Sequence, residues 1–189
     1  MASFSGRFSV VSAAIIVQFL ALTANSAVAQ RSIFIDSVCE RVSDKTYCLK
    51  TLLGNPAALA ANGLFPLAEV VVGLGKAHAE KTLAFIDEAA KRDPSKKAEF
   101  ASCRNAYVAI QASFRSALGE LTSSPDTANY DVMVSRDQTT EVTSLIGKNT
   151  DVASKTLAMM NDQMIRFIDL ATGATDAVDD DDENTFRRA

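Results

Sequence analysis

The residues that decide the fold are Cys103–Leu121, with the sequence CRNAYVAIQASFRSALGEL. Apolar or small side chains recur here at steps of three and four residues, at Cys103, Tyr107, Ile110, Phe114, Ala117 and Leu121. Because an α-helix turns once in about 3.6 residues, these steps align the side chains in one stripe. The stretch therefore predicts an amphipathic helix that begins near Asp93-Pro94 and ends before Ser123.

The same periodicity continues on both sides of this helix. It predicts a helix over Leu64–Arg92, one over 128–146 with the weakest stripe, and one over 151–172 that Asp151 caps and Gly173 ends. The links between these helices are short, so neighbouring helices run antiparallel. We therefore predict an all-α fold with an up-down-up-down four-helix bundle at residues 64–175.

The first residues have the pattern of a secretory signal peptide. Residues 1–29 contain Arg7, an apolar run Val10–Leu22, and small residues at Ala27 and Ala29. An uncleaved membrane anchor is the alternative, but the run is shorter than the roughly 20 residues that span a bilayer. We therefore expect the mature chain to begin at residue 30 and to enter an oxidising compartment.

The last residues of the chain are strongly acidic. Residues 176–189 contain the run Asp179–Glu183, whose like charges repel one another and favour a solvated segment. A calcium site is the alternative, but the run lacks the alternating ligands and turn glycine of an EF-hand loop. We predict a disordered tail after a folded domain at residues 30–175.

The composition excludes several classes of protein. The chain has 189 residues, of which 48% are hydrophobic and 22% charged, with only 8 Gly and 4 Pro. It is therefore too apolar to be disordered throughout and too poor in Gly and Pro to be fibrous. A formal net charge of −4 and the lack of a long basic cluster argue against nucleic-acid binding.

No catalytic constellation is present in the sequence. His78 is the one histidine, and it falls on the apolar stripe of the helix at Leu64–Arg92, which favours a hydrogen-bonded core residue. The motifs G-x-S-x-G, H-E-x-x-H, G-x-x-x-x-G-K-[ST], C-x-x-C and Glu-x-x-His are all absent. We therefore predict no catalytic, cofactor-binding or metal-binding residue, and a protein that is not an enzyme.

The three cysteines divide into a close pair and a single residue. In one continuous helix Cys39 and Cys48 would lie about 13 Å apart, whereas the Cα atoms of a disulfide lie within about 7 Å. If they pair, the chain must turn at Ser43-Asp44, which makes residues 30–63 a stapled helical hairpin. Cys103 lies on the apolar stripe, which favours a buried, unpaired thiol over a reactive or intermolecular one.

Taken in order, these features resemble the plant invertase and pectin methylesterase inhibitor family. The resemblance runs from Ile35 to about Ala171, and it rests on Cys39-x8-Cys48 followed by Leu49–Leu53, and on Cys103-x3-Tyr107 followed by small and apolar residues. It implies an N-terminal hairpin bridged by Cys39 and Cys48 and packed on a four-helix bundle. It also implies a secreted protein that blocks the active-site cleft of an extracellular carbohydrate-active enzyme.

The chain departs from the family pattern at two places. The family has a fourth cysteine in the third bundle helix, and the corresponding position here is Ser144, so Cys103 lacks the partner of the second bridge. Invertase-directed members can carry Pro-Lys-Phe between the second and third bundle helices, whereas this chain has Pro125–Asn129, with the sequence PDTAN. The second departure weakens the hypothesis that the protein inhibits invertase.

We therefore expect a secreted inhibitor of pectin methylesterase that acts in the apoplast or cell wall through a 1:1 complex. Inhibition of acid invertase, with the vacuole as a further location, is the alternative; a storage or ligand-carrying bundle with an internal cavity is the alternative of another class. We expect a monomer, with a Cys103-linked dimer as the alternative. We expect it to bind no nucleic acid and, after signal cleavage, no membrane. Helical phase suggests as candidate target contacts Gln111, Ser113, Gln138 and Thr140.

Overall fold

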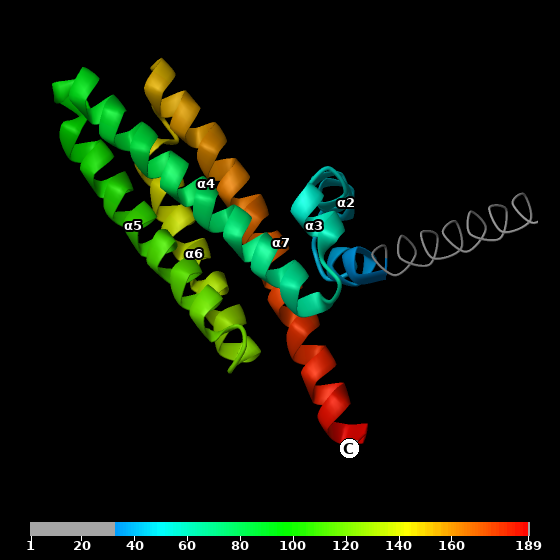
Figure 1. Cartoon of the computed structure of the whole chain (residues 1–189). Helices are drawn as coiled ribbons and strands as arrows, with labels where there is room; N and C mark the ends of the chain where they lie inside the picture. The colour runs from blue at the N-terminus through cyan, green and yellow to red at the C-terminus, as the bar shows by residue number, and fades with distance from the viewer. Residues whose placement is uncertain (1–32, 189) are drawn as a thin grey trace, which may run out of the picture.

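The computed structural model describes the backbone of residues 33–188 and the side chains of residues 33–181. Its described residues are helical and confirm the all-α prediction (Figure 1). The four long helices are α4 (Leu64–Arg92), α5 (Lys97–Glu120), α6 (Pro125–Ile146) and α7 (Val152–Arg188). Each packs against the next, and α7 packs back against α4, which closes the predicted up-down-up-down bundle. The predicted signal peptide, residues 1–29, lies outside the described residues.

Local capping explains where these helices begin. Asp93 accepts a hydrogen bond from the backbone N–H of Ser95 (3.0 Å) and starts a short 3-10 turn that leads into α5. Pro125 does not end α5 but opens α6, because a proline in the first helical turn loses no hydrogen bond. The carboxylate of Asp151 accepts from the N–H of Ser154 (2.9 Å), which confirms the predicted cap of α7.

The N-terminal segment is a hairpin, as predicted. A helical stretch at residues 33–39 is followed by a turn and by α2 (Lys45–Leu53), whose cap Asp44 accepts from the N–H of Tyr47 (2.9 Å). The Cys39–Cys48 disulfide joins the two arms with a Cα–Cα distance of 5.6 Å. A further short helix, α3 (Pro56–Ala60), was not expected and leads into α4.

The core runs the length of the bundle. Its largest fully buried side chains come from α4, from α5 and the residue after it, from α7 and from the hairpin, but not from α6: Tyr107, Phe100, Phe114, Ile35, Leu52, Leu67, Ile86, Ile110, Leu121, Leu157, Met164 and Ile168. Gly75 allows α4 and α5 to approach closely, because a Cβ there would lie 2.1 Å from Cε1 of Phe114. None of the helices in the described part of the chain is long and apolar enough to span a membrane.

The end of α7 differs from the sequence prediction. Gly173 does not stop the helix, which continues to Arg188, and Ala177 and Val178 are buried beyond the predicted boundary at residue 175. The expected disordered tail is therefore wrong for its first turns. The apolar stripe extends more than one turn past the glycine, to Val178, and its burial stabilises the helix where sequence propensity alone would end it.

Candidate functional site

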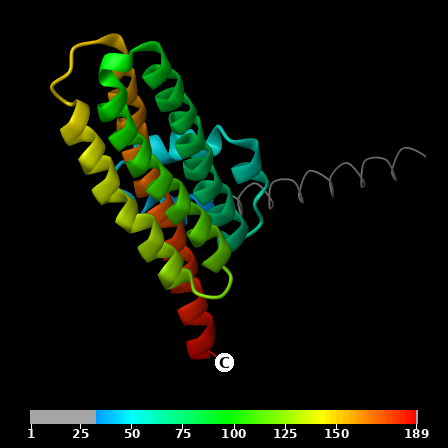
Figure 2. The ribbon, with the colours of Figure 1, turned by 90° about the vertical axis from the view of Figure 1, so that its left-hand side faces the viewer.

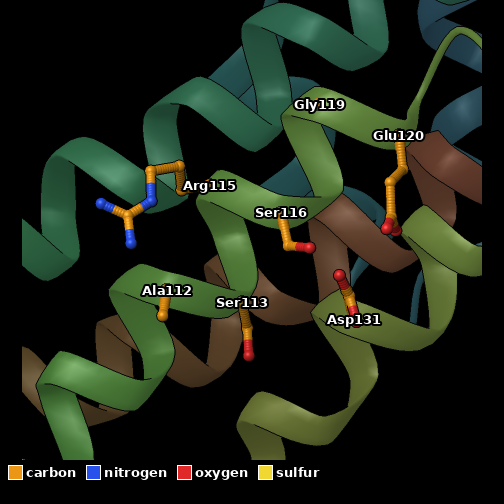
Figure 3. A pocket seen from close by; sticks show the side chains of 7 residues that line it. All are labelled: Ala112, Ser113, Arg115, Ser116, Gly119, Glu120 and Asp131. Carbon is orange, nitrogen blue, oxygen red and sulfur yellow. The ribbon is translucent and has the colours of Figure 1, made fainter.

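Helices α5 and α6 lie side by side on one side of the bundle (Figure 2). A shallow open groove lies between them. Its volume is about 610 Å³. It is lined by Ala112, Ser113, Arg115, Ser116, Gly119, Glu120 and Asp131 (Figure 3). The lining residues of α5 lie off the apolar stripe at Tyr107, Ile110 and Phe114, so folding leaves them at the surface.

The polar groups of this groove are only partly satisfied by the chain itself. Figure 3 shows Ser116 of α5 and Asp131 of α6 facing the same space, with Glu120 beside them. Among the described residues, Oε2 of Glu120 is buried and has no hydrogen-bond partner. The space beside Gly119 is open, because a Cβ there would meet no atom within 4 Å.

Of the four candidate contacts, the structure places only Ser113 in this groove. Gln111 turns toward α4, where its amide donates to Glu80 (3.3 Å). Thr140 is exposed on α6, and its hydroxyl donates to the backbone carbonyl of Arg136 (3.0 Å); Gln138 is half-buried. Helical phase thus identified surface positions but not which of them share one hollow.

The sequence prediction missed the groove residues Arg115, Ser116, Glu120 and Asp131. In the sequence these residues stand out only as polar residues beside the apolar stripe of α5 and in the first turns of α6. To predict that these residues line one groove, one must know which residues of α5 lie beside which residues of α6. The short link at residues 121–124 gives this register only once the two helices are known to be antiparallel neighbours.

His78 is held inside the bundle. Its Nε2–H donates to the carbonyl of Met160 (2.8 Å), and its ring lies 5.1 Å from that of Phe167. Burial lowers the pKa of His78, more than the Met160 hydrogen bond raises it, so the neutral form is favoured. Within the described residues no group of three or more His, Cys, Asp or Glu side chains could hold a metal ion.

Cys103 is free and buried on α5. Burial raises the pKa of its thiol to about 11, so the reactive thiolate is scarce at neutral pH. A covalent dimer through Cys103 would require this buried thiol to reach the surface. Ser144 is exposed on α6, and its hydroxyl donates to the carbonyl of Thr140 (3.0 Å). This exposure argues against Ser144 as the partner position of Cys103.

Residues 33–173 match the family described as plant invertase/pectin methylesterase inhibitor. The chain belongs to this family. It is therefore an enzyme inhibitor and not an enzyme, which agrees with the lack of a catalytic constellation in its sequence. A storage or ligand-carrying bundle, the alternative of another class, is not supported.

Two solved structures resemble the inhibitor. One is a mutant form of a pectin methylesterase inhibitor from Arabidopsis, with a TM-score of 0.66 and 19% identity over 75% of this chain and 95% of that chain. The other is a pectin methylesterase inhibitor from Arabidopsis thaliana, with a TM-score of 0.52 and 20% identity over 73% and 91%. At this identity the likeness shows the fold. A search of curated proteins finds no match.

Proposed function

We propose that this inhibitor blocks pectin methylesterase by laying the α5/α6 face across the active-site cleft of the enzyme in a 1:1 complex. The observation that carries the proposal is the open polar groove on that face, which Ser113, Ser116 and Asp131 line. Polar groups of the enzyme would enter this groove, and stable complexes of this kind bury about 1,600 Å² in total.

The choice of target rests on two further observations. The two solved structures named above, which share the fold, are described as pectin methylesterase inhibitors. The link between α5 and α6 also lacks the Pro-Lys-Phe motif of invertase-directed members at Pro125–Asn129. Acid invertase is therefore the less favoured target.

We also propose that the inhibitor acts outside the cell, in the cell wall. The Cys39–Cys48 disulfide supports this location, because such bonds persist in oxidising compartments. The signal-peptide pattern at residues 1–29 supports it as well.

Inhibition assays with the recombinant chain from residue 30 against pectin methylesterase and acid invertase test the target. We expect saturating inhibition of pectin methylesterase at one equivalent and no effect on invertase. The variant Ser116→Arg fills the groove and should raise the inhibition constant more than about tenfold, which corresponds to 1.4 kcal/mol of binding energy. The matched control is Met159→Arg, on α7 across the bundle from α5, where the side chain is 65% exposed; it should leave the constant unchanged.

Two results would count against the proposal. If neither enzyme is inhibited, the function itself is wrong. If pectin methylesterase is inhibited but Ser116→Arg behaves like Met159→Arg, the α5/α6 face is not the docking surface.

A further inference from the structure

The last described turns of α7 belong to the folded domain, although the family match ends at residue 173. Ala174 and Thr175 are fully buried, Ala177 is 1% exposed and Val178 is 4% exposed. A solvated tail would leave these side chains in water. Something must therefore cover both sides of the helix here, and the hairpin and the start of α6 do so.

The turn of the hairpin lies directly against the backbone of α7. A Cβ at Gly173 would come within 2.7 Å of Cγ1 of Val42 and 3.3 Å of the carbonyl oxygen of Val38. Only a glycine fits between the two segments at this distance. The close approach explains why a helix-weakening residue stands in the middle of α7.

Polar contacts continue this interface on both sides of Gly173. Before it, the carboxylate of Asp169 accepts from the backbone N–H of Ser43 (2.9 Å). After it, the guanidinium of Arg41 donates to Asp180 (2.7 Å) and lies 3.6 Å from Asp176. Arg41 is itself oriented by the carbonyl of Ser37, to which it donates (2.8 Å). The hairpin is thus held at points on α7 that span eleven residues, about three helical turns.

A second pair of residues reinforces the contact one turn earlier. Arg166 of α7 donates to the carboxylate of Asp44 (2.9 Å), and its guanidinium lies 5.0 Å from the ring centroid of Tyr47. The cation is therefore held by an ion pair on one side and by a cation–π contact on the other. Both partners belong to the hairpin, at the turn and the first turn of α2.

The opposite side of the same turns is tied to the bundle. The side-chain amide of Asn129, near the start of α6, donates to the carbonyl of Thr172 (3.0 Å) and to the hydroxyl of Thr175 (2.9 Å). Figure 1 shows the hairpin beside α7, and Figure 2 shows α7 running past the end of α6. Residues 172–180 therefore contact the hairpin on one side and α6 on the other.

We propose that residues 174–181 of α7 are a strap that holds the N-terminal hairpin on the bundle, and that without this strap the hairpin opens as a unit while the bundle stays folded. The hairpin has its own disulfide, so it can detach without losing its internal staple. Proteins open locally in cooperative units that often coincide with a supersecondary motif such as this hairpin.

Hydrogen exchange of the chain from residue 30 tests this proposal. The informative variant ends after Gly173, and the matched control ends after Asp181, beyond the last strap contact. We expect the control to exchange like the full chain. In the shorter variant, amides of residues 33–53 should lose protection by more than about tenfold, while those of α4 and α5 keep theirs. Unchanged hairpin protection, or an equal loss in hairpin and bundle, would overturn the proposal.

A milder variant keeps the test decisive if the short chain does not fold. Arg41→Ala removes the contacts of Arg41 with Asp176 and Asp180. Its control, Arg104→Ala, removes an exposed ion pair with Asp87 (2.8 Å) that joins α5 to α4. We expect Arg41→Ala to speed exchange of residues 33–53 by about two- to fivefold and Arg104→Ala to leave it unchanged. Equal behaviour of the two variants would refute the strap.

Discussion

The helices α5 and α6 are neighbours of similar length, but different forces hold their inner faces. The buried side of α5 is aromatic and aliphatic, with Tyr107, Ile110 and Phe114. The buried side of α6 is apolar at its ends but polar in its middle, where Ser135 and Thr139 face inward. Burial of apolar surface therefore positions α5, whereas α6 depends to a larger extent on directed hydrogen bonds.

Asn161 of α7 is the centre of these hydrogen bonds. Its side-chain oxygen accepts from the hydroxyl of Tyr107 (3.0 Å), and its amide donates to the carbonyl of Thr139 (2.9 Å) and the hydroxyl of Thr143 (3.0 Å). One buried amide thus links three bundle helices. A helix with a poor apolar stripe can therefore still be fixed in the bundle when a neighbouring helix supplies hydrogen bonds to its polar groups.

The largest loss of stability should come from a substitution on the buried apolar side of α5. Phe114→Ala removes a fully buried ring that packs on Gly75, and it should lower the free energy of unfolding by about 3–5 kcal/mol. The control Val108→Ala, on the same helix but 41% exposed, should change it by less than about 0.5 kcal/mol. Chemical denaturation measures both. Similar losses for the two variants would mean that the stripe of α5 does not dominate the core.

A new bridge across the α5/α6 pair should have the next largest effect. Because α5 ends at Glu120 and α6 begins at Pro125, residues whose numbers sum to about 245 lie at one level, which pairs Cys103 with buried Val142. Under oxidising conditions Val142→Cys should stabilise the fold by up to about 4 kcal/mol, the ideal entropy of closing that loop.

The control for this bridge is Ser144→Cys, at the exposed position that the sequence comparison suggested. We expect no disulfide with Cys103 and no change in melting temperature for this variant. Non-reducing mass spectrometry and thermal melts distinguish the two variants. A bridge in Ser144→Cys alone would show that the register inferred here is shifted.

The polar centre should show a smaller but specific effect. Asn161→Ala removes the acceptor of the Tyr107 hydroxyl, and we expect a loss of about 1–3 kcal/mol in the free energy of unfolding. A double-mutant cycle with Tyr107→Phe measures the coupling. If the two losses simply add, the hydrogen bond between Tyr107 and Asn161 contributes nothing to the free energy of unfolding.

Ser135 offers a test of the opposite sign. Among the described residues its hydroxyl is buried and has no hydrogen-bond partner. Ser135→Ala removes this unsatisfied group and should raise the free energy of unfolding by about 1 kcal/mol. Ser154→Ala is the control, since the Ser154 hydroxyl accepts from Asn149 (3.2 Å) and its removal should destabilise. A loss of stability in Ser135→Ala would show that the hydroxyl is satisfied after all.

The smallest effect concerns pH and the end of the bundle where α5 and α7 begin. The hydrogen bond from Lys96, reinforced by the N–H of Ser154, holds the pKa of Asp151 well below its usual range. A carboxyl whose folded pKa is lowered stabilises the fold above its unfolded pKa, and this contribution is lost as the pH falls.

Asp151→Asn keeps the helix cap but removes the charge. Its melting temperature should lie below that of the parent chain at pH 7, and the gap should shrink below about pH 4. Lys96→Met removes the same ion pair from its other side and should show the same dependence on pH. A gap that stays constant from pH 7 to pH 3 would contradict the assignment.

The sequence predicted the parts of the fold that depend on local pattern. The helix predicted from Leu64 to about Arg92 was confirmed, and so were the Asp151 cap and the turn between Cys39 and Cys48. The groove could not be predicted in the same way. Ser113 was identified, but Glu120 and Asp131 join it only through the packing of α5 on α6.

Helical periodicity and caps act over a few residues, so the sequence was enough to predict an all-α bundle; its resemblance to the inhibitor family implied the bridged hairpin and the function. Only the tertiary structure decided how far α7 extends, since Gly173 weakens a helix locally but permits the contact with Val42 that stabilises it. Helical phase places Ser135 and Thr139 on the weak inner stripe of α6, but only the packed structure shows that Asn161 of α7 donates to the carbonyl of Thr139 there. Long-range packing supplies the free energy that reverses these local preferences.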